Sequence, residues 1–148
     1  MPLLRSLLAT AVLVLCSSAD ATDTRGQASD GIVRVSLIRL IASPAAYDGK
    51  LVSVSGFAFI EFENNNLCIV RKPSSSHDCV WINYFDGPVE TDADMERYQA
   101  AREKWSKFNR RHISLRGTFD ASDSGHLGGS SGGIGHITDV SVLDSKRK

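Results

Sequence analysis

Net charge, long hydrophobic runs and cysteines are all scarce in this chain of 148 residues. Its 17 basic and 17 acidic residues give a formal net charge of zero, which argues against a strongly charged surface for nucleic acid or anionic membrane. The apolar run at residues 7–15 is too short to span a bilayer. No internal repeat is visible. With 42% hydrophobic residues, the chain is long and apolar enough to form one domain with a buried core.

Motifs for catalysis, metal binding and phosphate binding are also missing. No Cys-x-x-Cys or His-x-x-x-His pair occurs, and His126 and His136 are too far apart for a tight ligand pair. The glycine-rich segment 125–133 lacks the Gly-Lys-Ser/Thr ending of a phosphate-binding loop. Glu61 and Glu63 share a strand face in the manner of solvent-facing residues, and no serine lies in a nucleophile elbow. We therefore expect no enzyme activity, no cofactor and no metal site.

Residues 1–21 have the pattern of a secretory signal peptide. Arg5 precedes the apolar run and small residues follow it, so cleavage is expected after Ala19 or Ala21. Lipidation of Cys16 is the less favoured alternative, because a large leucine precedes it where a small residue is normal. The pattern predicts a periplasmic or secreted protein with no transmembrane segment in its mature form.

Two cysteines, Cys68 and Cys79, remain after removal of such a leader. Two cysteines in an oxidising compartment are usually joined. They lie in strand-like segments at 67–71 and 79–85, and residues 72–78 connect these as a hairpin loop. The two cysteines would then face each other across the hairpin, so we predict a disulfide, with two buried free thiols as the alternative.

Hydrophobic periodicity predicts a β-rich domain at residues 32–144, between a flexible leader at 22–31 and a basic tail at 145–148. A mid-strand glycine, Gly56, predicts a bulge or a sharp bend in the first strand. A turn is expected at 64–66. The predicted strands cover residues 51–63, 67–71, 79–85, 112–119 and 137–143.

Two helical segments accompany these strands. A short helix is expected at residues 36–43, where Ser36 can cap it and a proline follows. A longer amphipathic helix follows the third strand, and Thr91 and Asp94 have the spacing of a capping pair. Its apolar stripe consists of Tyr98, Ala101, Trp105 and Phe108.

Five strands with a helix between the third and fourth is the order of the OB-fold, a small Greek-key barrel. The helix would close one end of such a barrel with its aromatic side chains. A sandwich with a surface helix and an open α+β sheet are the alternatives. The sequence thus favours an all-β chain with one helix, in a five-stranded OB-fold-like barrel.

The entry to the predicted domain, Pro44–Ala45–Ala46–Tyr47–Asp48–Gly49–Lys50–Leu51–Val52–Ser53–Val54–Ser55–Gly56, also carries a family resemblance. Its Pro-x-x-Tyr-x-Gly-Lys turn and Val-x-Val-x-Gly strand resemble those of uncharacterised exported bacterial OB-fold proteins, of the tRNA-anticodon-binding-like type. The later segments 116–119, 125–126 and 131–132 resemble the same group. The resemblance implies an OB-fold and says little about function, because OB-folds bind sugars, nucleic acids, haem carriers and proteins.

Strand alternation predicts where such a domain would bind. Val80, Ile82 and Tyr84 form the better core set, which leaves Trp81 on the outer face; the opposite register would place Trp81 inside and Tyr84 outside. Tryptophan and arginine are frequent at binding hot spots. The contact surface is therefore expected on the outer face of the first three strands and the glycine-rich loop. Its candidate residues are Arg71, Trp81, Asn83, His126, Ser130 and Ser131.

These features favour an exported, non-catalytic binding module for a protein or an envelope component. An inhibitor or immunity-type protein is the first alternative, with residues 72–78 or 123–135 plugging the cleft of a partner enzyme. Binding of an oligonucleotide or oligosaccharide comes third, and nucleic acid is disfavoured by the zero net charge. The oligomeric state stays open.

Overall fold

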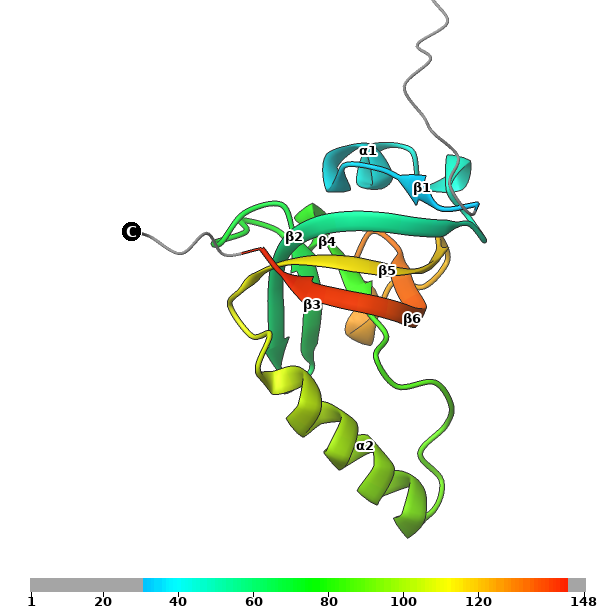
Figure 1. Cartoon of the computed structure of the whole chain (residues 1–148), viewed down its shortest axis with the longest axis vertical. Helices are drawn as coiled ribbons and strands as arrows, with labels where there is room; N and C mark the ends of the chain where they lie inside the picture. The colour runs from blue at the N-terminus through cyan, green and yellow to red at the C-terminus, as the bar shows by residue number, and fades with distance from the viewer. Residues whose placement is uncertain (1–30, 144–148) are drawn as a thin grey trace, which may run out of the picture.

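The computed structural model describes residues 31–143, which form a mixed β-sheet and one long helix (Figure 1). The expected signal peptide, the leader up to residue 30 and the basic tail lie outside the described residues. The sheet contains β1 (Val33–Arg34), β2 (Leu51–Glu61), β3 (Asn64–Cys68), β4 (Cys79–Ile82), β5 (His112–Asp120) and β6 (Gly133–Val142). The helices are α1 (Leu37–Ala42) and α2 (Asp92–Ser106), with short 3-10 turns at Pro44–Ala46, Ser76–Asp78 and His126–Gly128. The prediction of a β-rich chain with one main helix is confirmed.

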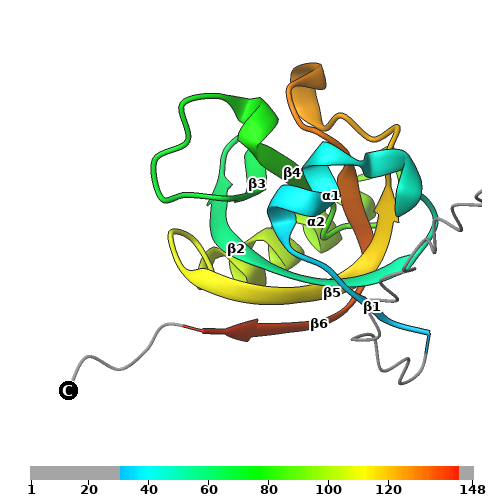
Figure 2. The same ribbon diagram turned by 90° about the horizontal axis from the view of Figure 1, so that it is seen from above.

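Strand pairing follows a circuit that begins and ends at β2. β2 pairs antiparallel with β5 and with β3, β3 pairs antiparallel with β4, β4 pairs in parallel with β6, and β6 returns antiparallel to β5. β1 adds a short parallel pairing to β2. Figure 2 shows how β2 curves along this circuit. β1 has no counterpart among the predicted strands, because two residues are too few to show an alternation.

A close approach of strands explains the glycine in the middle of β2. β2 pairs with β5 over 51–57 and with β3 over 57–61, so its partner changes at Phe57. A Cβ atom on Gly56 would lie 2.8 Å from the backbone oxygen of Cys68 and 2.9 Å from Cγ of Leu67. Only glycine fits at this crossing without a shift of its neighbours.

The core is built from alternate residues of the strands, as the sequence pattern predicts. β2 alternates buried and partly exposed positions along most of its length, and β5 does the same. Leu37 and Leu40 of α1 and Trp105 and Phe108 around the end of α2 join this cluster. Its fully buried side chains include Val52, Val54, Leu67, Val80, Ile82, Ile113, Leu115, Phe119 and Ile134.

Helix α2 begins with the predicted capping pair. Thr91 Oγ1 accepts a hydrogen bond from the backbone N–H of Asp94, and the Asp94 carboxylate accepts one from the backbone N–H of Thr91. Figure 1 shows that the helix points away from the sheet, and Trp105 near its end is its buried residue. Tyr84 covers part of its aromatic side, with ring centroids 5.5 Å from Trp105 and 6.3 Å from Tyr98.

Several predicted boundaries are wrong, among them the end of the second strand, which lies at Cys68 and not at residue 71. The turn between the first two long strands lies at residues 62–63 and not at 64–66, since Asn64 pairs with Glu61 and the asparagines belong to β3. The third strand ends at Ile82, because the chain beyond it leaves the sheet to pack on α2. The last strand begins at Gly133, where pairing with β5 overrides the poor strand preference of glycine.

Candidate binding surface

The outer face of β2, β3 and β4 carries a row of three side chains, two of them aromatic. Phe59 pairs with Asn66 across β2 and β3, and Asn66 pairs with Trp81 across β3 and β4. Residues paired across strands project from the same face of a sheet. Val80 and Ile82, on either side of Trp81, are buried, so this row faces away from the core. Trp81 itself is half-buried on the outer face, in the register that the alternation favoured.

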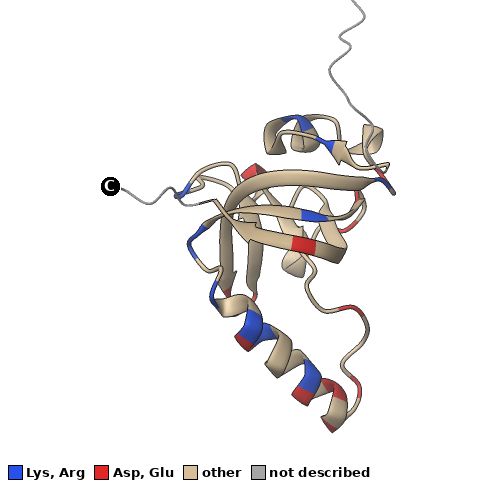
Figure 3. Ribbon diagram, viewed as in Figure 1, with Lys and Arg blue, Asp and Glu red and all other residues tan. Residues whose placement is uncertain are grey.

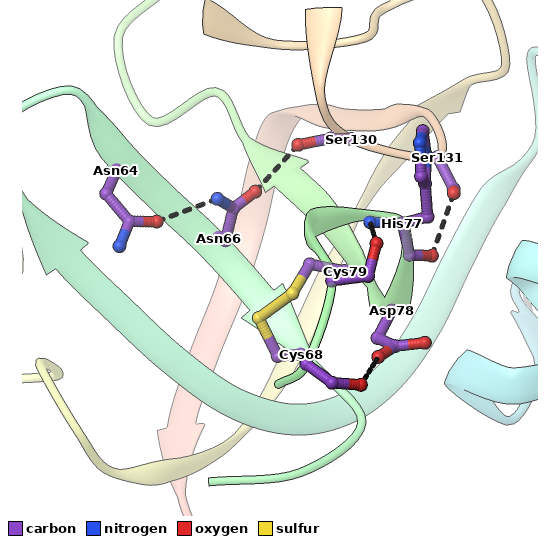
Figure 4. Close-up of a disulfide and its surroundings, with 10 residues drawn as sticks. Asn64, Asn66, Cys68, His77, Asp78, Cys79, Ser130 and Ser131 are labelled. Atoms are coloured by element: carbon purple, nitrogen blue, oxygen red, sulfur yellow. Dashed lines mark hydrogen bonds between the residues drawn. A yellow bond between two sulfur atoms is a disulfide. The ribbon is translucent and has the colours of Figure 1, made fainter. Parts of the chain in front are cut away.

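A disulfide occupies the next row of the same face. Cys68 and Cys79 are paired in the β3–β4 register, and their sulfur atoms are bonded (Figure 4). Both residues are buried, at 1% and 2% exposure, so the bond is protected from solvent reductants. The predicted disulfide is confirmed, and it fits an oxidising, extracellular environment.

The glycine-rich loop that follows β5 packs directly on Trp81. A Cβ atom on Gly125 would lie 2.7 Å from the indole ring, and Gly125 has a φ of +68°. Both the missing side chain and the left-handed backbone are therefore needed at this position. The contact holds the loop against the outer face and accounts for the partial burial of Trp81.

Two predicted site serines anchor the same loop. Ser130 Oγ donates a hydrogen bond to Oδ1 of Asn66 at 2.8 Å, and Ser131 Oγ donates one to the backbone oxygen of His77 at 2.9 Å (Figure 4). The backbone N–H of Trp81 donates to Gly132 O at 2.9 Å. Ser130 is buried, so these groups hold the loop in place and are already used within the chain.

The tip of the loop is the 3-10 turn His126–Gly128. His126 Nε2 lies 3.5 Å from Oε1 of Glu63, which connects the tip to the β2–β3 turn. Next to it, Leu127 is 90% exposed and has a φ of +63°. A large apolar side chain in a left-handed conformation is thereby presented to solvent on an anchored loop.

Arg71 lies over a groove on the β2 part of this face. Its guanidinium is 5.0 Å from the centroid of the Phe57 ring. Phe57 and Phe59 are both partly exposed and line the groove, whose volume is about 580 Å³. Lys72 and Pro73 form part of its wall.

The residues that line this groove have a net positive charge. Arg71, Lys72 and Arg110 line it together with one carboxylate, Glu61. Arg110 pairs with Glu61 at 3.0 Å, so the lining carries a net charge of +2, from three cations and one anion. The chain as a whole is neutral. An anionic group is therefore the ligand chemistry that this groove favours.

The structure separates one predicted site residue from the others. Asn83 lines a different cavity of about 360 Å³, whose lining includes four aspartates and His136. Among the described residues, no group of three or more potential ligand side chains could hold a metal ion.

Sequence reasoning missed Phe57, Phe59 and Arg110. The two phenylalanines alternate with buried Ala58 and Ile60, so strand parity alone places them on the outer face. Arg110 has no such signal, because its pairing with Glu61 joins residues 49 positions apart.

Comparisons of the chain with protein-family models, with curated proteins and with solved structures find no match. Within residues 31–143, no helix has the length and apolarity required to cross a membrane. The candidate surface must therefore be interpreted from its own geometry.

Proposed function

We propose that this protein is an exported, non-catalytic binding module that holds an extended, acidic segment of a partner protein in the groove over Phe57 and Phe59. The observation that carries the proposal is the combination of two partly exposed phenylalanine rings with a cationic rim. Aromatic residues and arginine are enriched at protein interfaces and dominate their hot spots. An acidic segment with an apolar side chain complements both features.

The strand circuit supports an OB-type barrel as the scaffold of this module. Five strands pair in the order β2–β3–β4–β6–β5 and back to β2, and α2 lies between β4 and β5 in the chain. A five-stranded Greek-key barrel binds ligands across its second and third strands and neighbouring loops. The face that carries Asn66, Trp81 and the glycine-rich loop corresponds to that region.

Selection of peptides from a displayed random library tests the proposal. The bait is the mature protein, and the counter-selection bait is Phe59→Ala. We expect enriched peptides to combine Asp or Glu with an aromatic or aliphatic residue, and their binding to weaken as salt is raised. Phe59→Ala should weaken the best peptide at least about tenfold, as expected for a central apolar anchor.

Controls for this experiment come from the same chain. Arg71→Gln should also weaken binding, whereas Lys104→Gln, an exposed cation on α2, should not. Equal enrichment on the wild type and on Phe59→Ala would contradict the proposal. So would a preference for basic peptides.

An inhibitor function is the second candidate, and the exposed side chain of Leu127 favours it. A loop anchored at Gly125, Ser130 and Ser131 presents this residue at 90% exposure. A preorganised loop loses little conformational entropy when it enters a cleft, which raises affinity. A tight one-to-one complex with one enzyme, weakened by Leu127→Ala and unaffected by Phe59→Ala, would favour this function over the groove.

A further inference from the structure

A second groove, lined by both polar and apolar side chains, lies between the β1–α1 segment and the outer face of β2 and β5. Val35, Leu37, Ile38 and Ile69 form its apolar part. The groove has a volume of about 750 Å³. Its lining includes Arg34 and Ser36 before α1, Ser53 and Ser55 of β2, and Ser114 and Arg116 of β5. No aspartate or glutamate lines it, in contrast to the phenylalanine groove.

Strand register brings these side chains together. Ser53 pairs with Arg34 on one side and with Arg116 on the other, so two arginines flank one serine across three adjacent strands. Ser55 and Ser114 are paired two residues further along β2. Directly paired residues have Cβ atoms about 5 Å apart on one face. Two cations and at least three hydroxyl groups therefore share one patch of the sheet.

The two arginines have hydrogen-bond donors that are available to a ligand. Neither Arg34 nor Arg116 forms an ion pair within the described part of the chain. The Nε atom of Arg116 is buried and has no hydrogen-bond partner there. A buried donor without a partner is costly, and an anionic acceptor would satisfy it with a charge-assisted hydrogen bond.

We propose that this groove binds a sugar that carries an anionic group. Arginine side chains only donate hydrogen bonds and match the oxygens of a phosphate or carboxylate. Serine hydroxyls both donate and accept, so they suit the hydroxyl groups of a sugar ring. A volume of about 750 Å³ exceeds the needs of an isolated ion and lies in the range of small-molecule sites. The ligand therefore combines an anion for the arginines with hydroxyl groups for the serines.

Substitution of Asp139 tests whether the positive potential of the groove contributes to anion binding. Asp139 is the β6 partner of Arg116, and Figure 3 shows the basic residue of β5 beside the acidic residue of β6. Its carboxylate lowers the positive potential that the groove offers to an anion. Asp139→Asn should therefore tighten the binding of an anionic sugar, which a purely structural role of the groove does not predict.

The test is a titration of the protein with glucose 6-phosphate, glucuronate, inorganic phosphate and glucose, followed by NMR shifts of backbone amides. We expect both anionic sugars to shift the amides of Ser53, Ser114 and Arg116 and to bind more tightly than inorganic phosphate. Glucose alone should bind least. Arg34→Gln and Arg116→Gln should each weaken binding about tenfold, as loss of a charge-assisted contact predicts.

Lys104→Gln makes the same charge change on α2, away from the groove, and should leave the affinity within about twofold, since screening limits the reach of an exposed charge. Phe59→Ala should have no effect, because this site is independent of the phenylalanine groove. An equal loss in Lys104→Gln and Arg34→Gln would refute a localised site. Equal affinities for glucose 6-phosphate and inorganic phosphate would refute the sugar contacts, and absence of shifts at these amides would refute the site.

Discussion

Removal of the Cys68–Cys79 bond has an effect on folding that can be calculated from the structure. The bond joins residues 11 positions apart, so it closes a loop of about a dozen residues. In the chain-entropy model, closing such a loop lowers the entropy of the unfolded chain enough to stabilise the fold by about 3 kcal/mol at 25 °C. The double variant Cys68→Ala/Cys79→Ala should therefore unfold with a free energy about 3 kcal/mol lower.

The position of the bond defines a local effect as well. β3 and β4 are joined by only three register pairs, and the disulfide lies in the last of them, where the chain leaves for residues 69–78. Without the bond, this end of the pair loses its covalent closure. Amide exchange should then increase in β4 and in the segment that carries Arg71 and Lys72, more than in β5.

Thermal and urea unfolding followed by circular dichroism measure the global effect. A loss of about 3 kcal/mol should lower the melting temperature of a domain of this size by roughly 10 °C or more. Reductant reaches the buried bond once the chain unfolds, so it should lower the stability of the wild type by a similar amount and leave the double variant unchanged. A difference below about 1 kcal/mol between wild type and double variant would show that the entropic reasoning is wrong for this loop.

Three further perturbations test separate parts of the structure. Gly125→Ala should displace the loop from Trp81, because the new Cβ atom would lie 2.7 Å from the indole and the backbone at this position has a φ of +68°. A red shift of the tryptophan emission would show the displacement, and an unchanged spectrum would contradict the packing. Hydrogen bonds from Thr91 and then from Arg97 lower the pKa of Asp94 from 3.8 to about 2. The capping contribution of Asp94 should therefore be present above about pH 4 and be lost as the pH falls toward 2; carboxyl NMR titration measures it, and an ordinary pKa for Asp94 would refute it. Burial raises the pKa of Tyr84 above its ordinary value of 10.0, and the neighbouring phenol of Tyr98 raises it further. Stability should consequently decline as the pH rises above about 10, and Tyr84→Phe should remove the last phenol to ionise in an alkaline absorbance titration.

The features that the sequence predicts correctly depend on interactions between residues that are close in the chain. The alternation in β2 and β5, the capping pair Thr91–Asp94 and the bridge between Cys68 and Cys79 each depend on residues that are near one another in the chain or across one hairpin. Such patterns are readable because side-chain direction has period two in strands and backbone caps follow fixed offsets.

Strand ends and the identity of the site depended instead on contacts between distant segments. The sequence predicts a turn at the asparagines 64–66, but these residues pair with β2 and form a strand. Tyr84 lies beyond the end of β4 and stacks on Trp105. Trp81 could be placed on the outer face by parity, but its cover by Gly125 could not.

The sequence by itself determined a β-rich chain with one capped helix, a disulfide and an outward-facing Trp81. Only the tertiary structure decided that Arg110 meets Glu61 beside Phe59, and that Arg34 and Arg116 flank the same serine of β2. The physical reason is that these neighbours are set by strand pairing between remote segments. That pairing depends on how the whole hydrophobic core closes, and no short stretch of sequence encodes it.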